Sequence, residues 1–456
     1  MSDVARSAES TVGVVGAGYV GLATAACLAH FGFRVVCVDS DAAKVQRLRA
    51  GSIDIQEPRM TELIRSGAAD GRLEFCSDIT ALSCSSTVML CLPTPPTASG
   101  DADLTAVHDV AEILARHLRP GSVLVVKSTV PVGTCADLAD RLAEHGISVA
   151  SNPEFLREGT AINDFLEPAR VVVGAGNDRT AAQVACLYTR IDAPIVCTDP
   201  ASAELAKYAS NAFLAMKTSY VNELGALCER VGADIDEVAH AVGMDPRIGP
   251  GNLRAGPGWG GSCLPKDTRA LAAIARRHGV RMPVLSATIR SNALQHHRVV
   301  GAVRRAVGPD RLAGARIAVL GITFKAGTDD TRESPALDVA HLLTEHGADV
   351  VACDPSVVEP IESTADALIA LYDDPYAASA GADVIVVLTE WPQFTALDWS
   401  RIADGMRERR CVDARGLLDG KSMRGAGFRY VRTGVAAPGN PERIRAVRVP
   451  SGFGSG

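Results

Sequence analysis

The sequence predicts an α/β protein with two Rossmann-like, doubly wound domains joined by a central region of long helices. Short apolar runs alternate with helical stretches over residues 1–200. No convincing β-like run occurs between about residues 201 and 306, and the alternation returns from Ala315. Strands that alternate with helices are typical of a parallel, doubly wound sheet. We therefore divide the chain into segments 1–200, 201–308 and 309–456.

The length and composition are those of a multidomain globular protein. A chain of 456 residues exceeds one ordinary hydrophobic core, and 47% hydrophobic with 22% charged residues is typical of globular proteins. The net charge of −7 and the lack of a Lys/Arg run argue against a nucleic-acid partner. The N-terminus is polar and no apolar run reaches the roughly 18 residues that span a bilayer. We therefore expect a cytoplasmic protein with no membrane partner.

The first segment begins with a βαβ unit. An apolar run at Val12–Val15 meets a glycine-rich turn and a helical stretch, and a second apolar run at Val35–Val38 ends in Asp39. Five further β-like runs follow, with helical segments between most of them: 87–92, 122–127, 148–151, 171–174 and 194–198. The sequence therefore predicts a parallel sheet in this segment.

The middle segment is expected to be helical. Residues 201–232 form one long predicted helix, whose apolar stripe recurs at three- and four-residue steps: Leu205, Ala209, Ala212, Met216 and Leu224. A helical segment between two α/β segments suits a dimerisation spine.

The third segment repeats the opening architecture without its glycine pattern. Residues 315–324 resemble a first strand, 334–347 a helix and 349–355 a second strand, which ends in Asp354. Two more predicted strands lie in 382–390 and 410–416, and the Pro/Gly-rich end from Gly434 is expected to form a mobile tail.

The glycine-rich turn fits a dinucleotide site. Gly16, Gly18 and Gly21 match GxGxxG between a strand and a helix, and Asp39 ends the next strand. Such glycines allow backbone N–H groups to approach a pyrophosphate at the helix N-terminus. Asp39 would accept hydrogen bonds from the ribose hydroxyls and repel a 2′-phosphate, so the motif favours NAD over NADP. The alternative is a glycine turn used only for helix–strand packing.

Cys263 differs in context from the other cysteines. Most of the twelve lie in apolar runs such as those around Cys37, Cys91, Cys197 and Cys353, where a free thiol is usually core. There is no CxxC pair, and the ten histidines show no metal-ligand spacing, so we expect neither disulfides nor a metal. Cys263 instead lies in the glycine-rich stretch GPGWGGSCLPKD, residues 256–267.

Two interpretations of Cys263 remain open from the residues alone. A cation such as Lys266, or a helix start, would lower the thiol pKa from about 8.5 and make the cysteine a nucleophile. Asp267, four residues later, would share its helix face. Alternatively, Cys263 is a small residue chosen for tight packing beside Gly260 and Gly261.

Three further groups of polar residues have both a functional and a structural interpretation. Lys207 and Asn211 are one helical turn apart, in a site or on a solvated face. Glu154 and Glu158 follow a strand, in a ligand loop or at a helix N-terminus. Lys325 and Arg332 precede a helix start at Pro335, where they would bind a diphosphate or remain solvated surface charges.

Seven motifs taken together resemble the nucleotide-sugar dehydrogenase family, and within it the branch that oxidises UDP-glucose. They occur in the family's order between residues 11 and about 415: GAGYVGL, KSTVPVGT, NPEFLREGTAI, ELAKYASNAFLAMKTSYVNE, GMDPRIGP, GWGGSCLPKD and FKAGTDDTRESPA. The resemblance implies a homo-oligomer, commonly a dimer, of two Rossmann-like domains joined by a long helix. Serine before Cys263 resembles the glucose branch, whereas relatives acting on N-acetylhexosamines tend to have histidine there.

The resemblance implies an NAD-dependent, four-electron oxidation of a sugar C6 hydroxyl to a carboxylate, with UDP-glucose giving UDP-glucuronate. An aldehyde cannot easily lose a second hydride, but a thiolate adduct on Cys263 is again an oxidisable centre. Its oxidation gives a thioester that water cleaves. By resemblance, Cys263 is the nucleophile, Lys207 and Asp267 manage the C6 proton and the oxyanion, and Glu154 activates water with help from Thr129.

The resemblance also assigns the remaining site residues. The catalytic residues are Cys263, Lys207, Asp267, Glu154, Thr129 and Asn211. The cofactor residues are Gly16, Gly18, Tyr19, Val20, Gly21, Asp39, Lys44, Thr94, Thr129, Glu158, Lys266 and Arg332. The substrate residues are Glu154, Phe155, Leu156, Arg157, Glu158, Lys207, Asn211, Arg247, Arg254, Gly258, Trp259, Gly260, Phe324 and Lys325. Arg247 would reach in from a neighbouring subunit.

Three alternative functions remain at this point. The substrate could be TDP-glucose or another nucleoside-diphosphate hexose, because no nucleobase motif is recognisable. A two-electron hydroxyacid dehydrogenase would need no nucleophilic cysteine. The third alternative is an NAD-binding scaffold with an inactive site. One observation argues against it, namely the joint presence of Cys263, Lys207, Asp267 and Glu154.

Overall fold

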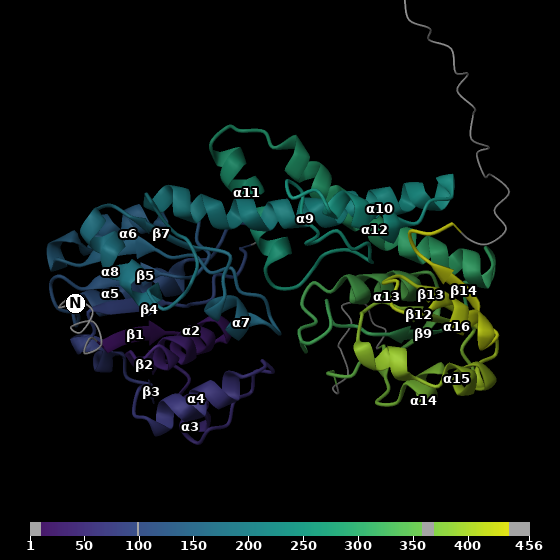
Figure 1. The fold of residues 1–456 in the computed structure, drawn as a ribbon, viewed down its shortest axis with the longest axis horizontal. Coiled ribbons are helices and arrows are strands. Elements are labelled where there is room, and N and C mark those ends of the chain that lie inside the picture. Colours follow the sequence, from purple (N-terminus) through teal and green to yellow (C-terminus); the bar gives the residue numbers. More distant parts are fainter. Residues whose placement is uncertain (1–10, 98–99, 358–368, 437–456) are drawn as a thin grey trace, which may run out of the picture. The chain divides into compact units, whose positions relative to one another are not determined.

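The computed structural model describes residues 11–97, 100–357 and 369–436, which form two compact units, each built on a β-sheet (Figure 1). The first unit comprises residues 1–212 and 266–282, and the second comprises 213–265 and 283–456. Most of the expected C-terminal tail, from residue 437 onward, lies outside the described residues.

The first unit contains an eight-stranded sheet in the order β3-β2-β1-β4-β5-β6-β7-β8. Its strands are β1 (Thr11–Val15), β2 (Arg34–Val38), β3 (Leu73–Cys76), β4 (Thr87–Leu90), β5 (Val123–Val126), β6 (Ser148–Ser151), β7 (Val171–Ala175) and β8 (Ile195–Thr198). Its helices include α2 (Tyr19–His30), α3 (Ala42–Arg49), α4 (Met60–Ala69), α5 (Thr105–Ala115), α6 (Thr134–Leu142), α7 (Ala161–Leu166) and α8 (Asp178–Ala185).

This sheet confirms the predicted doubly wound arrangement, with one correction. Strand β1 pairs in parallel with both β2 and β4, so the strand order reverses beside the glycine-rich turn, where doubly wound sheets bind their ligands. The expectation of an all-parallel sheet is wrong at β6 and β7, which pair antiparallel. Strand β3 was not predicted, because it is a short edge strand that alternates buried and exposed residues instead of forming an apolar run.

Alternating side chains divide the first core between the two faces of the sheet. Val12 and Val14 of β1 pack with α2, α4 and α7, whereas Val15 packs on the opposite face with α5 and α6. Because successive side chains of a strand point to opposite faces, the apolar run of β1 buries both sides. The strand is therefore fixed, and its carboxyl end presents the glycine-rich turn.

The second unit contains a six-stranded parallel sheet in the order β11-β10-β9-β12-β13-β14. Its strands are β9 (Arg316–Leu320), β10 (Asp349–Cys353), β11 (Ala370–Leu371), β12 (Val384–Val387), β13 (Arg410–Asp413) and β14 (Arg429–Arg432). Its helices include α10 (Ile235–Gly243), α12 (Pro283–Val307), α13 (Pro335–Glu345), α14 (Pro375–Ser379), α15 (Trp399–Gly405) and α16 (Gly420–Gly425). Helices α12 and α13 cover one face, and α14, α15 and α16 the other (Figure 1). The edge strands β11 and β14 were not predicted.

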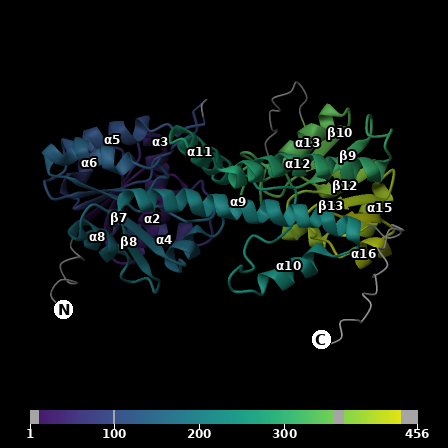
Figure 2. The same ribbon diagram turned by 90° about the horizontal axis from the view of Figure 1, so that it is seen from above.

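Two helices carry residues of both units. Helix α9 (Pro200–Val231) is one continuous helix, as predicted, and the unit boundary falls between Ala212 and Phe213 (Figure 2). Helix α11 (Leu264–Arg277) begins directly after Cys263, and its boundary falls between Pro265 and Lys266. No strand interrupts the described stretch from α9 to α12, in agreement with the sequence.

The cysteines confirm most of the predicted core positions. Cys37, Cys91 and Cys353 are buried, whereas Cys263 is exposed. The expectation for Cys197 is wrong, because this residue is exposed on β8, the edge strand of the first sheet. An apolar run on an edge strand is covered less completely than the same run at the centre of a sheet.

Candidate active site

The three glycines of the turn after β1 meet different physical demands. Gly16 has φ +97°, and a Cβ there would lie 2.5 Å from the Cys91 carbonyl oxygen. A Cβ on Gly21 would lie only 1.7 Å from the Gly16 carbonyl oxygen, so this glycine allows α2 to pack against the turn. A Cβ on Gly18 would meet no atom within 4 Å. Gly18 thus faces open space at the N-terminus of α2, where a pyrophosphate can approach the backbone.

Asp39 at the end of β2 is held as a carboxylate beside this turn. Its Oδ2 accepts the Ala17 amide at 2.7 Å and lies 3.3 Å from Lys44 Nζ, and its Oδ1 accepts the Asp41 amide at 3.0 Å. Burial raises the pKa of Asp39, but the two amides and the Lys44 charge outweigh it, so the net pKa is lowered. A fixed anion at this position suits ribose hydroxyls.

Tyr19 links the glycine-rich turn to the loop after β6. Its hydroxyl bonds the buried Glu57 carboxylate and accepts the Gly159 amide at 2.8 Å. The Arg157 carbonyl oxygen lies 3.1 Å from the same hydroxyl. Burial and Glu57 raise the pKa of Tyr19, so the phenol stays protonated. No sequence motif pointed to Glu57, which is distant in the chain from every residue it holds.

Glu154 and Lys207 form a buried ion pair, which rules out a solvated helix face at Lys207. Lys207 Nζ lies 2.9 Å from Glu154 Oε1, and the two side chains are only 4% and 8% exposed. Glu154 Oε2 accepts the Leu156 amide at 2.6 Å. Burial raises the pKa of Glu154. The charge and hydrogen bond of Lys207 are the main opposing effects, and the net shift of the pKa is downward. The loop after β6 is thereby tied to α9.

Asn211, one turn beyond Lys207 on α9, holds a second buried carboxylate. Its Nδ2 donates to Asp267 Oδ2 at 2.6 Å, and Lys266 Nζ lies 2.6 Å from Asp267 Oδ1. Asp267 is almost fully buried in the first turn of α11. The Asn211–Asp267 hydrogen bond therefore connects α9 to the first turn of α11.

The other predicted residues of the first unit surround these groups. Thr94, after β4, donates to the Thr129 carbonyl oxygen at 2.8 Å and joins two neighbouring strand ends. The Phe155 ring lies 3.7 Å from the Arg170 guanidinium carbon and 5.4 Å from Lys207 Nζ. Leu156, Glu158 and Val20 are partly buried, and Arg157 is exposed with its guanidinium paired to Asp164 at 2.6 Å. Arg170 was not predicted.

Cys263 in the second unit ends a tightly packed glycine loop. A Cβ on Gly260 would lie 2.1 Å from the Glu333 carbonyl oxygen, and one on Gly261, at φ +82°, would lie 2.8 Å from the Phe324 ring. The loop therefore requires these glycines. Cys263 is exposed and lies directly before α11. By contrast, burial raises the pKa of Cys91 to about 12, so that cysteine stays a thiol.

Trp259 and Gly258 belong to the buried framework of this loop. The Trp259 amide donates to Asn292 Oδ1 and its indole N–H to Ser219 Oγ, both at 2.9 Å. Gly258 adopts φ +143° and packs against Asn292 and His296. Arg254 and Arg247 are exposed, and the Arg247 guanidinium pairs with Asp245 at 2.6 Å.

The loop after β9 carries Phe324, Lys325 and Arg332. Arg332 pairs with Asp330 at 2.7 Å, and Lys325 Nζ lies 5.5 Å from the centre of the Phe324 ring. Helix α13 starts with Pro335 at its first turn, as predicted, and its N-cap Ser334 donates to the Ile322 carbonyl oxygen at 2.7 Å. The cations thus precede a capped helix start.

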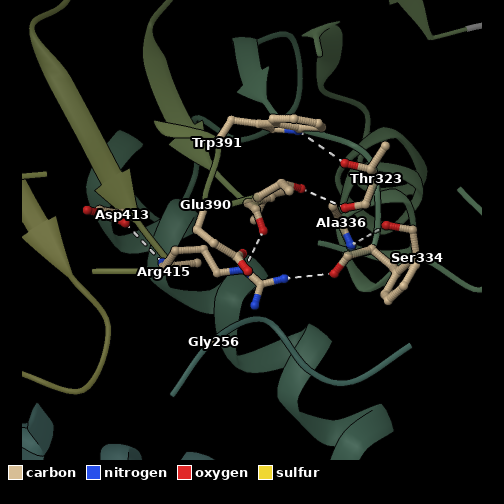
Figure 3. Close-up of polar contacts among 12 residues, drawn as sticks. Gly256, Thr323, Ser334, Ala336, Glu390, Trp391, Asp413 and Arg415 are labelled. Carbon is tan, nitrogen blue, oxygen red and sulfur yellow. Dashed lines mark hydrogen bonds and ion pairs between the residues drawn. The ribbon is translucent and has the colours of Figure 1, made fainter. Parts of the chain in front are cut away.

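Arg415 braces this loop and was not predicted. Its guanidinium donates to the Leu388 carbonyl oxygen at 2.8 Å and the Phe324 carbonyl oxygen at 3.1 Å, and Nε lies 3.0 Å from Glu390 Oε2 (Figure 3). A Cβ on Gly256 would lie 3.1 Å from Arg415 Nη1. Arg415 follows β13 in a stretch whose pattern predicts only a strand, and no motif indicates this role.

The described residues contain no group of three or more His, Cys, Asp or Glu side chains that could hold a metal ion. None of their helices is long and apolar enough to cross a membrane. The first unit therefore offers two buried carboxylates, two lysines and a dinucleotide-type turn, and the second unit offers an exposed thiol.

Comparisons with known proteins agree with this set of groups. The chain matches the UDP-glucose/GDP-mannose dehydrogenase family in its NAD binding domain at 10–192, its central domain at 201–294 and its UDP binding domain at 318–420. It is 43% identical to a UDP-glucose 6-dehydrogenase of Rhizobium meliloti, covering 92% of this chain and 98% of the relative. A UDP-glucose dehydrogenase structure from Pyrobaculum islandicum has TM-score 0.85 at 38% identity, covering 94% and 99%. A UDP-D-ManNAc dehydrogenase from Pyrococcus horikoshii has TM-score 0.83 at 26% identity, covering 93% and 99%.

The surroundings of Gly18 and Gly21 predict that alanine at the first weakens NAD binding, whereas alanine at the second destabilises the fold. Gly18→Ala adds a methyl group to open space, so we expect the melting temperature to hold while the Kd for NAD rises about tenfold or more. Gly21→Ala meets backbone and should lower the free energy of unfolding by about 3 kcal/mol. Calorimetric NAD titration and thermal melting measure the two effects. Equal losses of stability in both variants would contradict the assignment.

Proposed function

The chain belongs to the UDP-glucose/GDP-mannose dehydrogenase family, and we propose that it oxidises the C6 alcohol of UDP-glucose to the carboxylate of UDP-glucuronate with two NAD. Relatives at 39–43% identity over most of the chain are named UDP-glucose 6-dehydrogenase. The N-acetylmannosamine relative shares the fold at only 26% identity, so the fold alone does not select the sugar. The observation that carries the mechanism is the exposed Cys263 at the start of α11, the helix that also bears Lys266 and Asp267.

The three sequence segments take three roles in this proposal. Segment 1–200 binds NAD, segment 201–308 carries the cysteine loop and mediates dimerisation, and segment 309–456 binds the nucleotide sugar. The family match divides the chain at nearly the same places, which supports this division.

NAD fits the turn after β1. Gly16, Gly18 and Gly21 leave the backbone open to a pyrophosphate, and the Asp39 carboxylate suits the ribose hydroxyls. The proposed cofactor set is completed by eight further residues: Tyr19, Val20, Lys44, Thr94, Thr129, Glu158, Lys266 and Arg332. When bound, NAD accepts one hydride in each of the two oxidations.

Lys207 and Asp267 manage the first oxidation. The C6 hydroxyl loses its proton to this pair as its hydride leaves, which gives the aldehyde. The ammonium of Lys207 is only 4% exposed and is held by Glu154, so in this proposal it stabilises the developing oxyanion strongly. Asn211 fixes the Asp267 carboxylate for this step.

Cys263 makes the second oxidation possible. Its thiolate adds to C6 of the aldehyde, forming a C–S bond and an oxyanion that the same cations stabilise. Loss of the C6 hydride then yields a thioester on Cys263. Water attacks that carbonyl, the C–S bond breaks, and the carboxylate product leaves with the thiol restored.

Glu154 directs the hydrolytic water. Its net lowered pKa keeps it ionised at neutral pH, so it can accept a proton as water attacks the thioester. Thr129, after the neighbouring strand β5, helps to place that water.

The proposed substrate residues lie in three loops of the sequence. Phe155, Leu156, Arg157 and Glu158 of the loop after β6 face the sugar in this proposal. Gly258, Trp259 and Gly260 shape the cysteine loop, while Phe324, Lys325 and Arg254 contact the diphosphate side. Arg247, whose side chain is 88% exposed, extends to the site of the other subunit.

NADH stoichiometry tests the reaction. With UDP-glucose limiting and NAD in excess, we expect two NADH per UDP-glucose, measured by absorbance. Cys263→Ser should lower kcat by about a thousandfold or more because no thioester can form. One NADH per sugar, or near-normal turnover of the serine variant, would support a two-electron dehydrogenase instead. NAD binding without turnover of any sugar nucleotide would indicate a scaffold.

Nucleotide preference is tested by a substrate panel. We expect kcat/KM for UDP-glucose to exceed that for TDP-glucose and for UDP-N-acetylmannosamine by about tenfold or more, which is a difference of about 1.4 kcal/mol. Steady-state NADH formation with each sugar nucleotide measures these values. A higher kcat/KM for TDP-glucose would reassign the substrate while leaving the chemistry intact.

An apolar stripe on α9 supports a homodimer. Phe213, Tyr220 and Leu227 recur every seven residues and are 57%, 55% and 55% exposed. Large apolar side chains at this spacing on one helix face mark a contact surface. The twelve free cysteines fit a reducing compartment, and we place the enzyme in the cytoplasm.

A charge in this stripe should dissociate the dimer. We expect Tyr220→Glu to halve the mass measured by analytical ultracentrifugation, because the interface would bury an unpaired carboxylate. Ile113→Glu on α5, which is likewise exposed and apolar in the wild type, should leave the mass unchanged. A dimer that survives in Tyr220→Glu would argue against this surface.

A further inference from the structure

Lys127 is a buried cation of the first unit that the proposed mechanism does not use. It directly follows β5 and is 4% exposed. Asn152 directly follows the neighbouring strand β6, and its backbone amide donates to the Val126 carbonyl oxygen at 2.9 Å. The parallel pairing of β5 with β6 therefore places Lys127 beside the start of the segment that ends in Glu154.

The ammonium of Lys127 is held by two oxygens and two aromatic rings. Its Nζ lies 3.3 Å from Asn152 Oδ1 and 3.4 Å from the Tyr188 hydroxyl. It also lies 5.6 Å and 5.8 Å from the ring centres of Phe165 and Tyr188. The Tyr188 hydroxyl donates to Asn152 Oδ1, and Asn152 Nδ2 donates to the Val172 carbonyl oxygen at 2.8 Å. The network is closed and fixes Asn152 from both ends of its amide.

Both oxygens within hydrogen-bond distance of the Lys127 ammonium belong to neutral groups, the Asn152 amide and the Tyr188 hydroxyl. Burying an ammonium costs several kcal/mol, and neutral acceptors compensate for only part of this. A neutral donor would hold Asn152 at lower cost. The positive charge is therefore the feature that needs an explanation, and Glu154, two residues beyond Asn152, is the anion on which it acts.

We propose that Lys127 is a positioning residue for Glu154: through Asn152 it fixes the segment that carries the carboxylate, and its charge keeps that carboxylate ionised. In this proposal it acts through Asn152 and through its charge, not as a substrate ligand. The functional part of this inference rests on the proposed hydrolytic role of Glu154.

The double use of Lys207 explains why a second cation is useful. Lys207 is the direct partner of Glu154 and, in the proposed mechanism, its ammonium also stabilises the oxyanion at C6. When that ammonium is shared with the oxyanion, the buried Glu154 loses part of its main counter-charge and tends more strongly to take up a proton. Lys127 has no part in these steps, so its charge acts on Glu154 throughout.

The other groups around Glu154 do not supply this charge. Lys207 faces it from α9 and the Leu156 amide from its own loop. Cys91, after β4, is a neutral thiol whose pKa burial raises to about 12. Burial likewise raises the pKa of Tyr188, so it too is neutral. Arg170, which lines the same cavity as Glu154, stacks its guanidinium on the Phe155 ring. Lys127 and Lys207 are the cations whose charges lower the pKa of Glu154.

The test compares Lys127→Met, which removes the charge, with Lys127→Arg, which keeps it. Without the charge the pKa of Glu154 rises, and below that pKa the protonated carboxyl cannot accept a proton from water. We expect the acidic limb of kcat to move up by about one pH unit in Lys127→Met, a tenfold loss at pH values below the limb. KM for UDP-glucose should change less than about twofold, because in this proposal Lys127 acts on Glu154 and not on the sugar nucleotide. Lys127→Arg should retain the wild-type limb.

An infrared titration provides a readout that needs no turnover. The Glu154 carboxylic acid band, identified as the signal that Glu154→Gln removes, should appear at higher pH in Lys127→Met than in wild type. Equal, pH-independent losses of kcat in both Lys127 variants, with an unmoved Glu154 band, would overturn the proposal. If Lys127→Met does not fold, Tyr188→Phe removes one anchor of the ammonium and should give a smaller shift of the same sign, whereas no shift would overturn it.

The same measurements separate this inference from the proposed function. Full turnover by Glu154→Gln would remove the hydrolytic role of Glu154, yet the infrared band would still report whether Lys127 controls its ionisation. Conversely, a lost kcat in Glu154→Gln with an unmoved band in Lys127→Met would uphold the function and refute the role of Lys127.

Discussion

The buried ion pair between Glu154 and Lys207 is the interaction on which the first unit's site depends. Removing one partner of such a pair typically costs 3–5 kcal/mol, because the other charge is left uncompensated in a dry environment. The pair therefore ties the loop after β6 to α9 more firmly than backbone contacts alone would. Asn211 and Asp267 then extend the same connection by one helical turn to α11. Apolar side chains at these positions would stabilise the fold but could not take part in a reaction. The buried charges are therefore more typical of a functional site than of a hydrophobic core.

The two sheets follow one plan but end in different chemistry. In the first, Asp39 holds the glycine-rich turn through the Ala17 amide and leaves Gly18 facing open space. In the second, Asp354 at the end of β10 accepts the Ile322 and Thr323 amides at 2.8 and 3.1 Å. The Trp391 indole reaches the same carboxylate oxygen. There the turn is filled by its own side chains, so the equivalent position supports the neighbouring loop with Lys325 and Arg332.

The elements that could be predicted from the sequence are those with a strong local pattern. The glycine-rich turn, the long helix α9 and the helix start at Pro335 each carry their own pattern and were predicted. The antiparallel β6–β7 pair and the exposure of Cys197 were not, because strand direction and edge position are set by tertiary pairing and leave the apolar run unchanged. Glu57, Arg170 and Arg415 were missed for a related reason: each acts on residues far away in the chain.

The close packing of Gly260 and Gly261 limits how the cysteine loop can change over evolutionary time. Any side chain at Gly260 would overlap the Glu333 carbonyl oxygen, and one at Gly261 would overlap the Phe324 ring. Neither position can drift without a compensating change in another segment. Ser262, partly buried beside the thiol, is not bound by this restriction. Substitutions in this loop are therefore expected at the position next to the nucleophile. One substitution there alters the surroundings of the sulfur and leaves the backbone in place.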